Sequence, residues 1–241
     1  MRPPAGGPRL GRMQEQDSRS GTYTTLAAGR DFRHELEIKR SRFITVLRRA
    51  GTEAAARDLV ADLRREFHDA RHHCSAFVLG PDRTIQRSSD DGEPAGTAGI
   101  PMLEALLKRE TAPGVTDLSD TSAVVVRYFG GVLLGAGGLV RAYSESVSAA
   151  LDLAPLVRRS RLRICSTAVP HAAAGRLEND LRATGAVMAE TSYQDRHTVL
   201  RIAVPDHAAA IAAATDRVLQ LTAGSATLTP GGTEWVDEAI T

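Results

Sequence analysis

The segment AVVVRYFGGVLLGAGGLVRAYSESV, residues 123–147, places a strand, a glycine-rich loop and a helix in direct succession. Residues 123–129 are mostly β-branched or aromatic, which is typical of a strand. Five glycines fall within residues 130–138, and from Leu139 onward apolar residues recur at helical spacing. A glycine loop that opens a helix can turn backbone N–H groups toward an anion. The segment therefore predicts a mixed α and β fold with a candidate binding loop.

The glycine loop does not match the standard nucleotide fingerprints. It lacks the third glycine of a dinucleotide site, and no Lys-Ser/Thr pair follows it, as a P-loop would require. Two interpretations stay open: an anion-binding nest flanked by Arg127 and Arg141, or a tight turn that needs positive φ at several glycines. The residues concerned are Tyr128, Gly130, Gly131, Gly135, Gly137 and Gly138.

An acidic segment, SSDDGEPAGTAGIP at 88–101, precedes a helix predicted near 100–107. The carboxylates of Asp90, Asp91 and Glu93 are the ligand type that Mg²⁺ or Ca²⁺ prefers, although the EF-hand spacing is absent. The alternative is an acidic turn that braces the helix through its N–H groups or pairs with arginines. We expect Thr97 to cap this helix.

A third cluster is HHC at 72–74, which begins a predicted strand over 72–79. Because side chains alternate along a strand, His72 and Cys74 share one face and His73 points to the other. The pair suggests a Cys–His nucleophile or a metal site. The alternative is that Cys74 is a small buried hydrophobe.

Basic residues form the fourth feature. Lys39, Arg40 and Arg42 cluster near the second predicted strand, at 32–38, and a second group of arginines lies at 158–163. Such patches can follow a phosphate backbone, or they can be ordinary solvated surface. The net charge of the chain is only +1, so nucleic-acid binding would have to come from local patches.

The second half of the chain shows a regular order of elements. The apolar pattern predicts strand 159–168, helix 170–184, strands 186–193 and 197–204, a helix capped by Asp206 and ending near 221, and strand 225–229 before Pro230. This β-α-β-β-α-β order is that of the ferredoxin-like split unit. In the first half, helix 52–67 begins after Thr52, a favourable N-cap.

The predicted fold class is therefore α+β with two domains, divided where Pro155 ends the helix begun at 139. We assign residues 21–156 to an N-terminal α/β sandwich and 157–241 to a ferredoxin-like C-terminal sandwich. Residues 1–20 are rich in Pro, Gly, Arg and Ser, and we expect a disordered tail.

Composition excludes several classes of protein. The two cysteines form neither a disulfide framework nor a zinc pattern, which fits a reducing cytoplasm. No apolar run is long enough for a membrane helix, and the N-terminus does not read as a signal peptide. The motifs G-x-S-x-G, H-E-x-x-H and Cys-x-x-Cys are absent. We expect no membrane association, no metal and no cofactor.

Four segments together resemble the YigZ/IMPACT family: KRSRF at 39–43, DARHHCSAF at 69–77, DDGEPAGTAGIPML at 90–103, and VVVRYFGGVLLGAGGLVRAYSESV at 124–147. The resemblance spans roughly residues 22–155. The unit at 159–236 is similar to the small domain that accompanies this family in bacteria, which is itself similar to the last domain of elongation factor G. The sequence departs from the family at Leu133, where members often carry Lys, and at His73, where Asn is common.

The resemblance implies an N-terminal fold like that of a domain in ribosomal proteins and translation factors. Eukaryotic members regulate translation by interfering with the activation of a starvation-sensing kinase. They do so through an extra N-terminal domain that this sequence does not contain, so we expect that role to transfer poorly. For the bacterial type the family implies binding to RNA or to the ribosome.

Three hypotheses follow. In the first, the protein is a translation-related regulator that binds RNA or the ribosome through the motif cluster, with Lys39, Arg42, Arg127, Arg141 and the glycine loop as contacts. In the second, it is a small-molecule or metal-dependent enzyme that uses Asp90, Asp91 and Glu93 beside His72 and Cys74. In the third, the motifs stabilise an interface between domains or protomers. The sequence leaves open whether the protein is an enzyme, which RNA or ligand it binds, and its oligomeric state.

Overall fold

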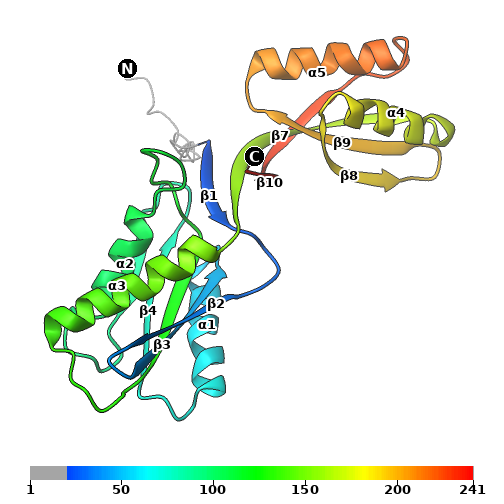
Figure 1. Ribbon diagram of the computed structural model, residues 1–241. Helices are drawn as coiled ribbons and strands as arrows, with labels where there is room; N and C mark the ends of the chain where they lie inside the picture. Colours follow the sequence, from blue (N-terminus) through cyan, green and yellow to red (C-terminus); the bar gives the residue numbers. More distant parts are fainter. Residues whose placement is uncertain (1–20, 241) are drawn as a thin grey trace, which may run out of the picture.

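A computed structural model describes residues 21–240, and the predicted disordered tail at 1–20 lies outside the described residues. The described chain folds into two five-stranded sheets and five helices, in agreement with the predicted α+β class (Figure 1). The elements are β1 Thr22–Leu26, β2 Phe32–Ile38, β3 Ser41–Arg49, α1 Glu53–Glu66, β4 His72–Leu79, β5 Ile85–Ser89, α2 Gly99–Lys108, β6 Thr121–Tyr128, α3 Ala136–Leu153, β7 Leu156–Val169, α4 His171–Ala183, β8 Val187–Tyr193, β9 Thr198–Pro205, α5 Ala208–Leu221 and β10 Thr229–Ala239.

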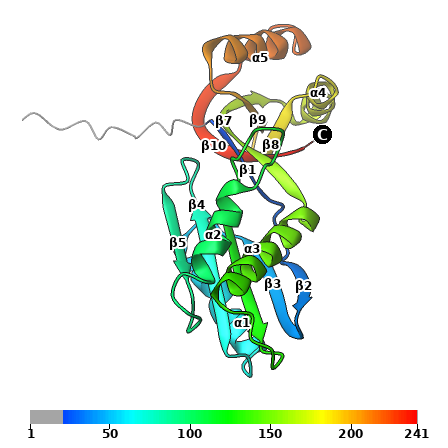
Figure 2. The ribbon, with the colours of Figure 1, turned by 60° about the vertical axis from the view of Figure 1, so that its left-hand side comes forward.

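The first sheet is antiparallel and has the strand order β2-β3-β6-β4-β5. Helix α1 covers one face, and α2 and α3 cover the other (Figure 2). Strand β6 lies in the middle, so Val124 and Val126 pack toward α1 while Val125 packs toward α2 and α3. Burial on both faces explains why residues 123–126 are continuously apolar.

The second sheet contains β10-β7-β9-β8, and α4 and α5 pack on one of its faces around Leu177, Ile202 and Val218. The element order β7-α4-β8-β9-α5-β10 agrees with the order predicted from the sequence. Strand β1 also belongs to this sheet, because it pairs with residues 156–160 of β7. The division at residue 156 remains a prediction about folding units.

Polar contacts join the two sheets near the start of β6. The carboxylate of Asp120 accepts a hydrogen bond from the Tyr23 hydroxyl in β1 and another from the Gly80 N–H at 2.9 Å. Arg49 at the end of β3 donates to Asp237 in β10 at 2.9 Å. The opposite end of β6, where the motif residues lie, points away from the second sheet (Figure 1).

Two local predictions were wrong. Asp206 does not cap α5; its carboxylate pairs with Arg163 at 2.7 Å, and His207 caps the helix by accepting the Ala210 N–H. The last strand covers Thr229–Ala239 instead of the predicted 225–229, with a register shift after Pro230. Since β10 pairs only with β7, a proline without an N–H group is tolerated at this edge.

No helix among residues 21–240 has the length and apolar character needed to cross a membrane.

Candidate functional site

The motif segments meet at the end of the first sheet that lies far from the second sheet. Arg127 on β6 is flanked by Phe43 on β3 and by His72 on β4. Loop 90–98, which opens α2, and loop 129–135, which opens α3, leave the sheet at this same end (Figures 1 and 2). The fold thus brings together segments that are far apart in the sequence.

A buried ion pair forms the floor of the site. The Arg127 guanidinium donates to Glu93 Oε1 at 2.6 Å, and these side chains are 8% and 4% exposed. The Tyr143 hydroxyl donates to the same oxygen at 2.8 Å, and burial raises the pKa of Tyr143 above its usual range. Because a buried pair is stable only when it is well hydrogen-bonded, these contacts fix Glu93 firmly. The predicted pairing of this acidic segment with arginine is confirmed at Glu93.

Aromatic rings enclose the guanidinium of Arg127. Its central carbon lies 5.4 Å from the centre of the Phe43 ring and 5.8 Å from that of Phe129. Ser41 accepts a longer hydrogen bond from Arg127, at 3.4 Å, and also accepts the Gly130 N–H at 3.2 Å. The cation is therefore held in place from β3, from β6 and from the loop after β6.

Asp90 braces the N-terminus of α2. Its carboxylate accepts the N–H groups of Gly96, Ala98 and Gly99 at 2.8 to 3.0 Å. Burial alone would raise the pKa of Asp90, but these three donors outweigh it and lower the pKa below its usual value. Thr97 does not cap the helix as predicted, because its hydroxyl donates to the Pro94 carbonyl at 2.7 Å.

Asp91 connects the acidic loop to α1 and β4. Its carboxylate accepts from Arg64 at 2.6 Å and from the backbone N–H of His73 at 2.6 Å. The His72 Nδ1 lies 2.9 Å from the Asp91 carbonyl. The carboxylates of Asp90 and Asp91 thus point to different partners, and the described residues contain no group of three or more His, Cys, Asp or Glu side chains that could hold a metal.

Cys74 is completely buried between α2, α3 and the acidic loop. Its thiol donates to the Asp90 carbonyl at 3.0 Å and lies 3.4 Å from the Tyr143 hydroxyl. Burial raises the pKa of the Cys74 thiol to about 12, and neighbouring carboxylates add to this rise. The geometry supports the interpretation of Cys74 as a small core residue rather than a nucleophile.

The structure explains why two positions of the loop are occupied by glycine. A Cβ on Gly130 would lie 2.0 Å from the backbone carbon of Arg40, so only glycine allows the loop to cross the β2–β3 turn. Gly135 has φ +72° and is the N-cap of α3, where no side chain satisfies the first N–H groups. The remaining glycines are Gly131 with φ +83°, Gly137 in open space, and Gly138 packed against Leu134.

A cavity of about 350 Å³ opens between the two loops. Glu93 and Arg127 lie at its polar side, and Phe129 and Leu133 are exposed at its rim, by 54% and 83%. A mostly apolar cavity with a few fixed polar groups is typical of a small-ligand site. Its lining consists of Arg71, His72, Glu93, Pro94, Arg127, Phe129, Leu133, Leu134, Gly135, Ala136 and Leu139.

Several predicted site residues lie outside this cavity. Strand alternation turns Tyr128 toward the α1 side of the sheet, where it donates to Asp69 at 2.7 Å. Arg42 lies over the Tyr128 ring and pairs with Glu35 at 2.7 Å. Lys39 is exposed in the β2–β3 turn, and Arg141 on α3 contacts the Gly137 carbonyl at 3.3 Å.

Arg71, Phe129 and Leu133 line the cavity but are not among the site residues predicted from the sequence. Arg71 lies inside the quoted motif at 69–77, and adjacency to His72 was the available signal. The apolar pattern places Phe129 in a strand over 123–129, whereas the strand ends at Tyr128 and Phe129 begins the loop. The apolar run at 132–134 within a loop was a further signal, because a loop leaves such side chains exposed.

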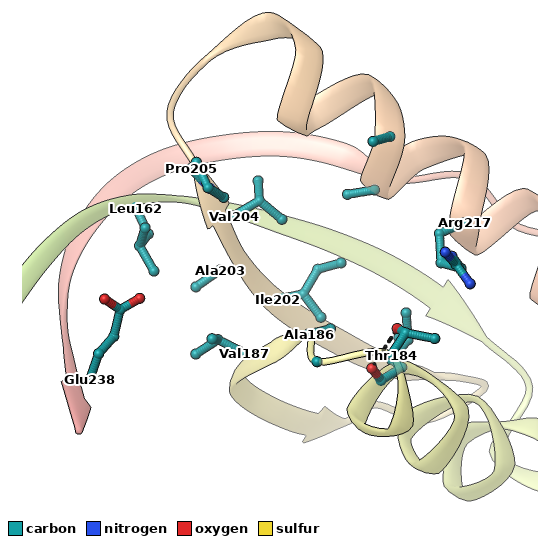
Figure 3. A pocket seen from close by; sticks show the side chains of 14 residues that line it. Leu162, Thr184, Ala186, Val187, Ile202, Ala203, Val204, Pro205, Arg217 and Glu238 are labelled. Carbon is teal, nitrogen blue, oxygen red and sulfur yellow. Dashed lines mark hydrogen bonds between the residues drawn. The ribbon is translucent and has the colours of Figure 1, made fainter. Parts of the chain in front are cut away.

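A second cavity, of about 400 Å³, lies in the other half of the molecule beside β9 and α5 (Figure 3). Apolar residues such as Ile202 and Val204 line it, and Arg217 and Glu238 lie at its two ends (Figure 3). None of the motif residues lies there. We therefore place the candidate site in the smaller cavity at the end of the first sheet.

Comparison with known proteins places this fold and motif cluster in a recognised class. The model of the Impact N-terminal domain matches residues 39–151, the range that contains the motif segments. The chain is 44% identical over 173 residues to "IMPACT family member YvyE" of Bacillus subtilis (strain 168), an alignment that covers 72% of this chain and 75% of that protein. The chain belongs to the IMPACT family, as the resemblance of its motifs predicted.

Two further relatives agree with this assignment. "IMPACT family member YigZ" of Escherichia coli (strain K12) is 49% identical over 128 residues, which cover 52% of this chain and 59% of that protein. A crystal structure described as that of "an hypothetical protein" is 36% identical with a TM-score of 0.55, and the alignment covers 92% of this chain and 98% of that one.

Proposed function

We propose that this protein is a translation-related regulator that binds RNA, either free or within the ribosome, at the far end of the first sheet. One observation carries the proposal: four cations at this end of the sheet form no ion pair with a carboxylate of residues 21–240, unlike Arg127, which pairs with Glu93. Arg71 lines the cavity, the Arg40 backbone lies against Gly130, and Arg141 lies on the first turns of α3. The set is Lys39, Arg40, Arg71 and Arg141.

Unpaired cations at one end of a sheet favour a polyanionic partner. Lys and Arg that are not neutralised within the protein can displace counterions from phosphates, and this displacement is the main source of affinity for nucleic acids. The exposed ring of Phe129 beside these cations offers a surface on which a base can stack. Cations and an aromatic ring around a cavity suit single-stranded RNA better than a regular duplex.

The fold of the two halves gives further support to this proposal. The sheet order β10-β7-β9-β8, with both helices on one face, supports a ferredoxin-like second half similar to the last domain of elongation factor G. We likewise propose that the first half is of the type found in ribosomal proteins. Fold likeness alone does not decide function, whereas the unpaired cations and the cavity bear on it directly.

The enzymatic alternative has little support from the geometry. Asp90 is used by the N-terminus of α2, Asp91 by Arg64 and the backbone of β4, and the Cys74 thiol is buried. We also propose that the protein works in the cytoplasm, since its two cysteines are free and buried.

The test is a titration of the full chain against fluorescently labelled single-stranded RNA at several KCl concentrations. We expect binding that weakens with salt. Arg71→Ala and Arg141→Ala should each reduce the affinity about fivefold at low salt and lower the salt slope by about one phosphate contact.

Arg196→Ala is the matched control, because Arg196 is an exposed and unpaired cation in the β8–β9 turn, far from the cavity. It should bind RNA like the unmodified chain. Absence of RNA binding at low salt, or equal losses in all three variants, would contradict the proposed site.

A further inference from the structure

We propose that the cavity receives a single nucleobase that carries an exocyclic amino group, and that Glu93 reads this group. The inference depends on the proposed RNA binding and specifies what the same site recognises. It starts from an acceptor that the protein itself leaves unused.

The unused acceptor is Glu93 Oε2. Both donors near this carboxylate, Arg127 and Tyr143, are directed at Oε1. No described residue donates a hydrogen bond to Oε2. Atoms that are fully buried and lack a partner do not include this oxygen, so Oε2 keeps some accessible surface. The side chain is 4% exposed and lines the cavity, so the cavity is the direction from which Oε2 can be reached. A carboxylate oxygen held in such a place favours a ligand that donates a hydrogen bond.

His72 adds a second acceptor to the same cavity. Its Nδ1 lies 2.9 Å from the Asp91 carbonyl, and since a carbonyl only accepts, Nδ1 must carry the proton. In the neutral imidazole the other ring nitrogen, Nε2, then accepts. His72 lines the cavity and no described residue donates to Nε2. In this tautomer His72 offers a second acceptor beside Glu93 Oε2 among the residues that line the cavity, and a ligand that supplies donors suits both.

The walls of the cavity suit a flat ring. Phe129, Leu134, Leu139 and Pro94 contribute apolar surface, and the cavity volume of about 350 Å³ is in the range of small-ligand sites. Stacking of a base on an aromatic side chain contributes substantially to single-strand binding. Of the chemical groups in RNA, only a base has both a flat apolar face and an edge with N–H donors.

The mouth of the cavity suits the phosphate attached to that base. Gly135 and Ala136 line the cavity at the start of α3, whose first N–H groups have no side-chain cap. Arg71 lines the cavity as well and pairs with no carboxylate among residues 21–240. A phosphate at this position would meet a helix N-terminus and a cation together.

The two acceptors discriminate between bases. Cytosine, adenine and guanine each carry an amino group that can donate to Glu93, and an acidic side chain accepting from the cytosine amino group is an established pairing. Uracil carries a carbonyl oxygen at the position of the cytosine amino group, and this oxygen would face the carboxylate. Cytosine and uracil thus form a matched pair for the test.

The experiment compares labelled C12 and U12 RNA by fluorescence anisotropy with the full chain. We expect C12 to bind about tenfold more tightly than U12. Glu93→Gln should abolish or reverse the preference for C12, because the amide oxygen stays on Arg127 and Tyr143 and the amide NH2 group, a donor, takes the place of Oε2. Phe129→Ala should lower the affinity for both RNAs by a similar factor. The fold should be preserved, because this residue is 54% exposed. Tyr193→Ala, at an exposed aromatic residue of β8, should change neither affinity.

The outcomes separate the two proposals. Equal binding of C12 and U12, still weakened by Arg71→Ala, would overturn base reading and leave RNA binding intact. No binding of either RNA at low salt would overturn the proposed function itself. Should Glu93→Gln fail to fold, calorimetric titration of the unmodified chain with cytidine and uridine monophosphates replaces it, and equal affinities there would also overturn base reading.

Discussion

The two loops at the end of the first sheet are built in opposite ways. Loop 90–98 is rich in charge, but its polar groups are used by the fold, since Asp90 accepts three backbone N–H groups of the α2 start. Loop 129–135 has almost no polar side chains, yet it opens α3 without a side-chain cap and exposes Phe129 and Leu133. The charged loop (90–98) therefore serves mainly to support the fold, and the glycine loop (129–135) provides the accessible surface of the site.

The comparison shows that clustered polar residues do not by themselves mark an open site. Whether they are available depends on whether nearby backbone and side-chain groups already satisfy them. Glu93 is the exception within the charged loop, because it contributes one paired and one unpaired oxygen to the cavity. The charged loop thus builds one wall of the site that the glycine loop encloses.

The strongest test of this division is Gly130→Ala. Its Cβ would lie 2.0 Å from the Arg40 backbone carbon, so the glycine loop and the β2–β3 turn must move apart. We expect a loss of at least about 4 kcal/mol in the free energy of unfolding, measured by urea denaturation. Gly137→Ala is the control, because a Cβ there meets nothing and the residue is helical, and it should gain roughly 0.5–1 kcal/mol. Equal stability of the two variants would show that the loop is not anchored at Gly130.

The second test concerns the thiol beneath the charged loop. With a pKa of about 12, Cys74 should react with iodoacetamide at neutral pH about a thousandfold more slowly than an exposed cysteine. Peptide mass spectrometry after timed labelling measures the rate, and labelling in urea provides the reference. Rapid labelling of Cys74 in the folded protein, together with loss of RNA binding, would show that this thiol is a reactive group of the site.

The third test removes the helix brace. Asp90→Asn should lower the free energy of unfolding at pH 7 by about 2 kcal/mol, because an amide cannot satisfy the three N–H donors as a carboxylate does. The folded pKa of Asp90 is depressed, so its contribution is present above about pH 4 and is lost as pH falls through the folded pKa.

Urea denaturation from pH 7 to pH 3.5 checks the direction in which the contribution of Asp90 to the free energy of unfolding changes with pH. The difference between the unmodified chain and Asp90→Asn should shrink at the acid end. Asp58→Asn, on the exposed face of α1, should match the unmodified chain throughout. A difference for Asp90→Asn that does not depend on pH would mean that the charge of the brace is unimportant.

Much of the fold could be predicted because periodicity reports burial. Strand β6 is apolar on both faces because it is central, and helix α1 begins after Thr52, which caps it by accepting the Ala55 N–H at 3.2 Å. Pairing between distant segments leaves no such signal. The addition of β1 to β7, and the continuation of β10 past Pro230, depend on partners far away in the sequence.

The candidate site was predictable as a set of segments but not as a geometry. The motif segments lie together at one end of the first sheet, and each carries residues that the core alone does not require. Periodicity could not tell that Asp90 turns to its own helix while Glu93 turns to Arg127, since the residues stand three apart in an irregular loop. Alternation along the strand places Tyr128 on the opposite face from Arg127, but it could not show that α1 covers that face or that Arg42 lies there over the Tyr128 ring.

The last test changes the open loop without touching the scaffold. Leu133 is 83% exposed at the rim of the cavity. Leu133→Lys should leave the free energy of unfolding within about 0.5 kcal/mol of the unmodified chain, because an exposed side chain makes few contacts. It should strengthen binding to single-stranded RNA by a few fold at low salt and steepen the salt slope by about 0.7, the increment for one more phosphate contact. Leu153→Lys, at an exposed leucine at the far end of α3, is the matched control for added charge. If both variants bind RNA alike, the added charge acts through the overall field, and the glycine loop is not where the RNA backbone passes.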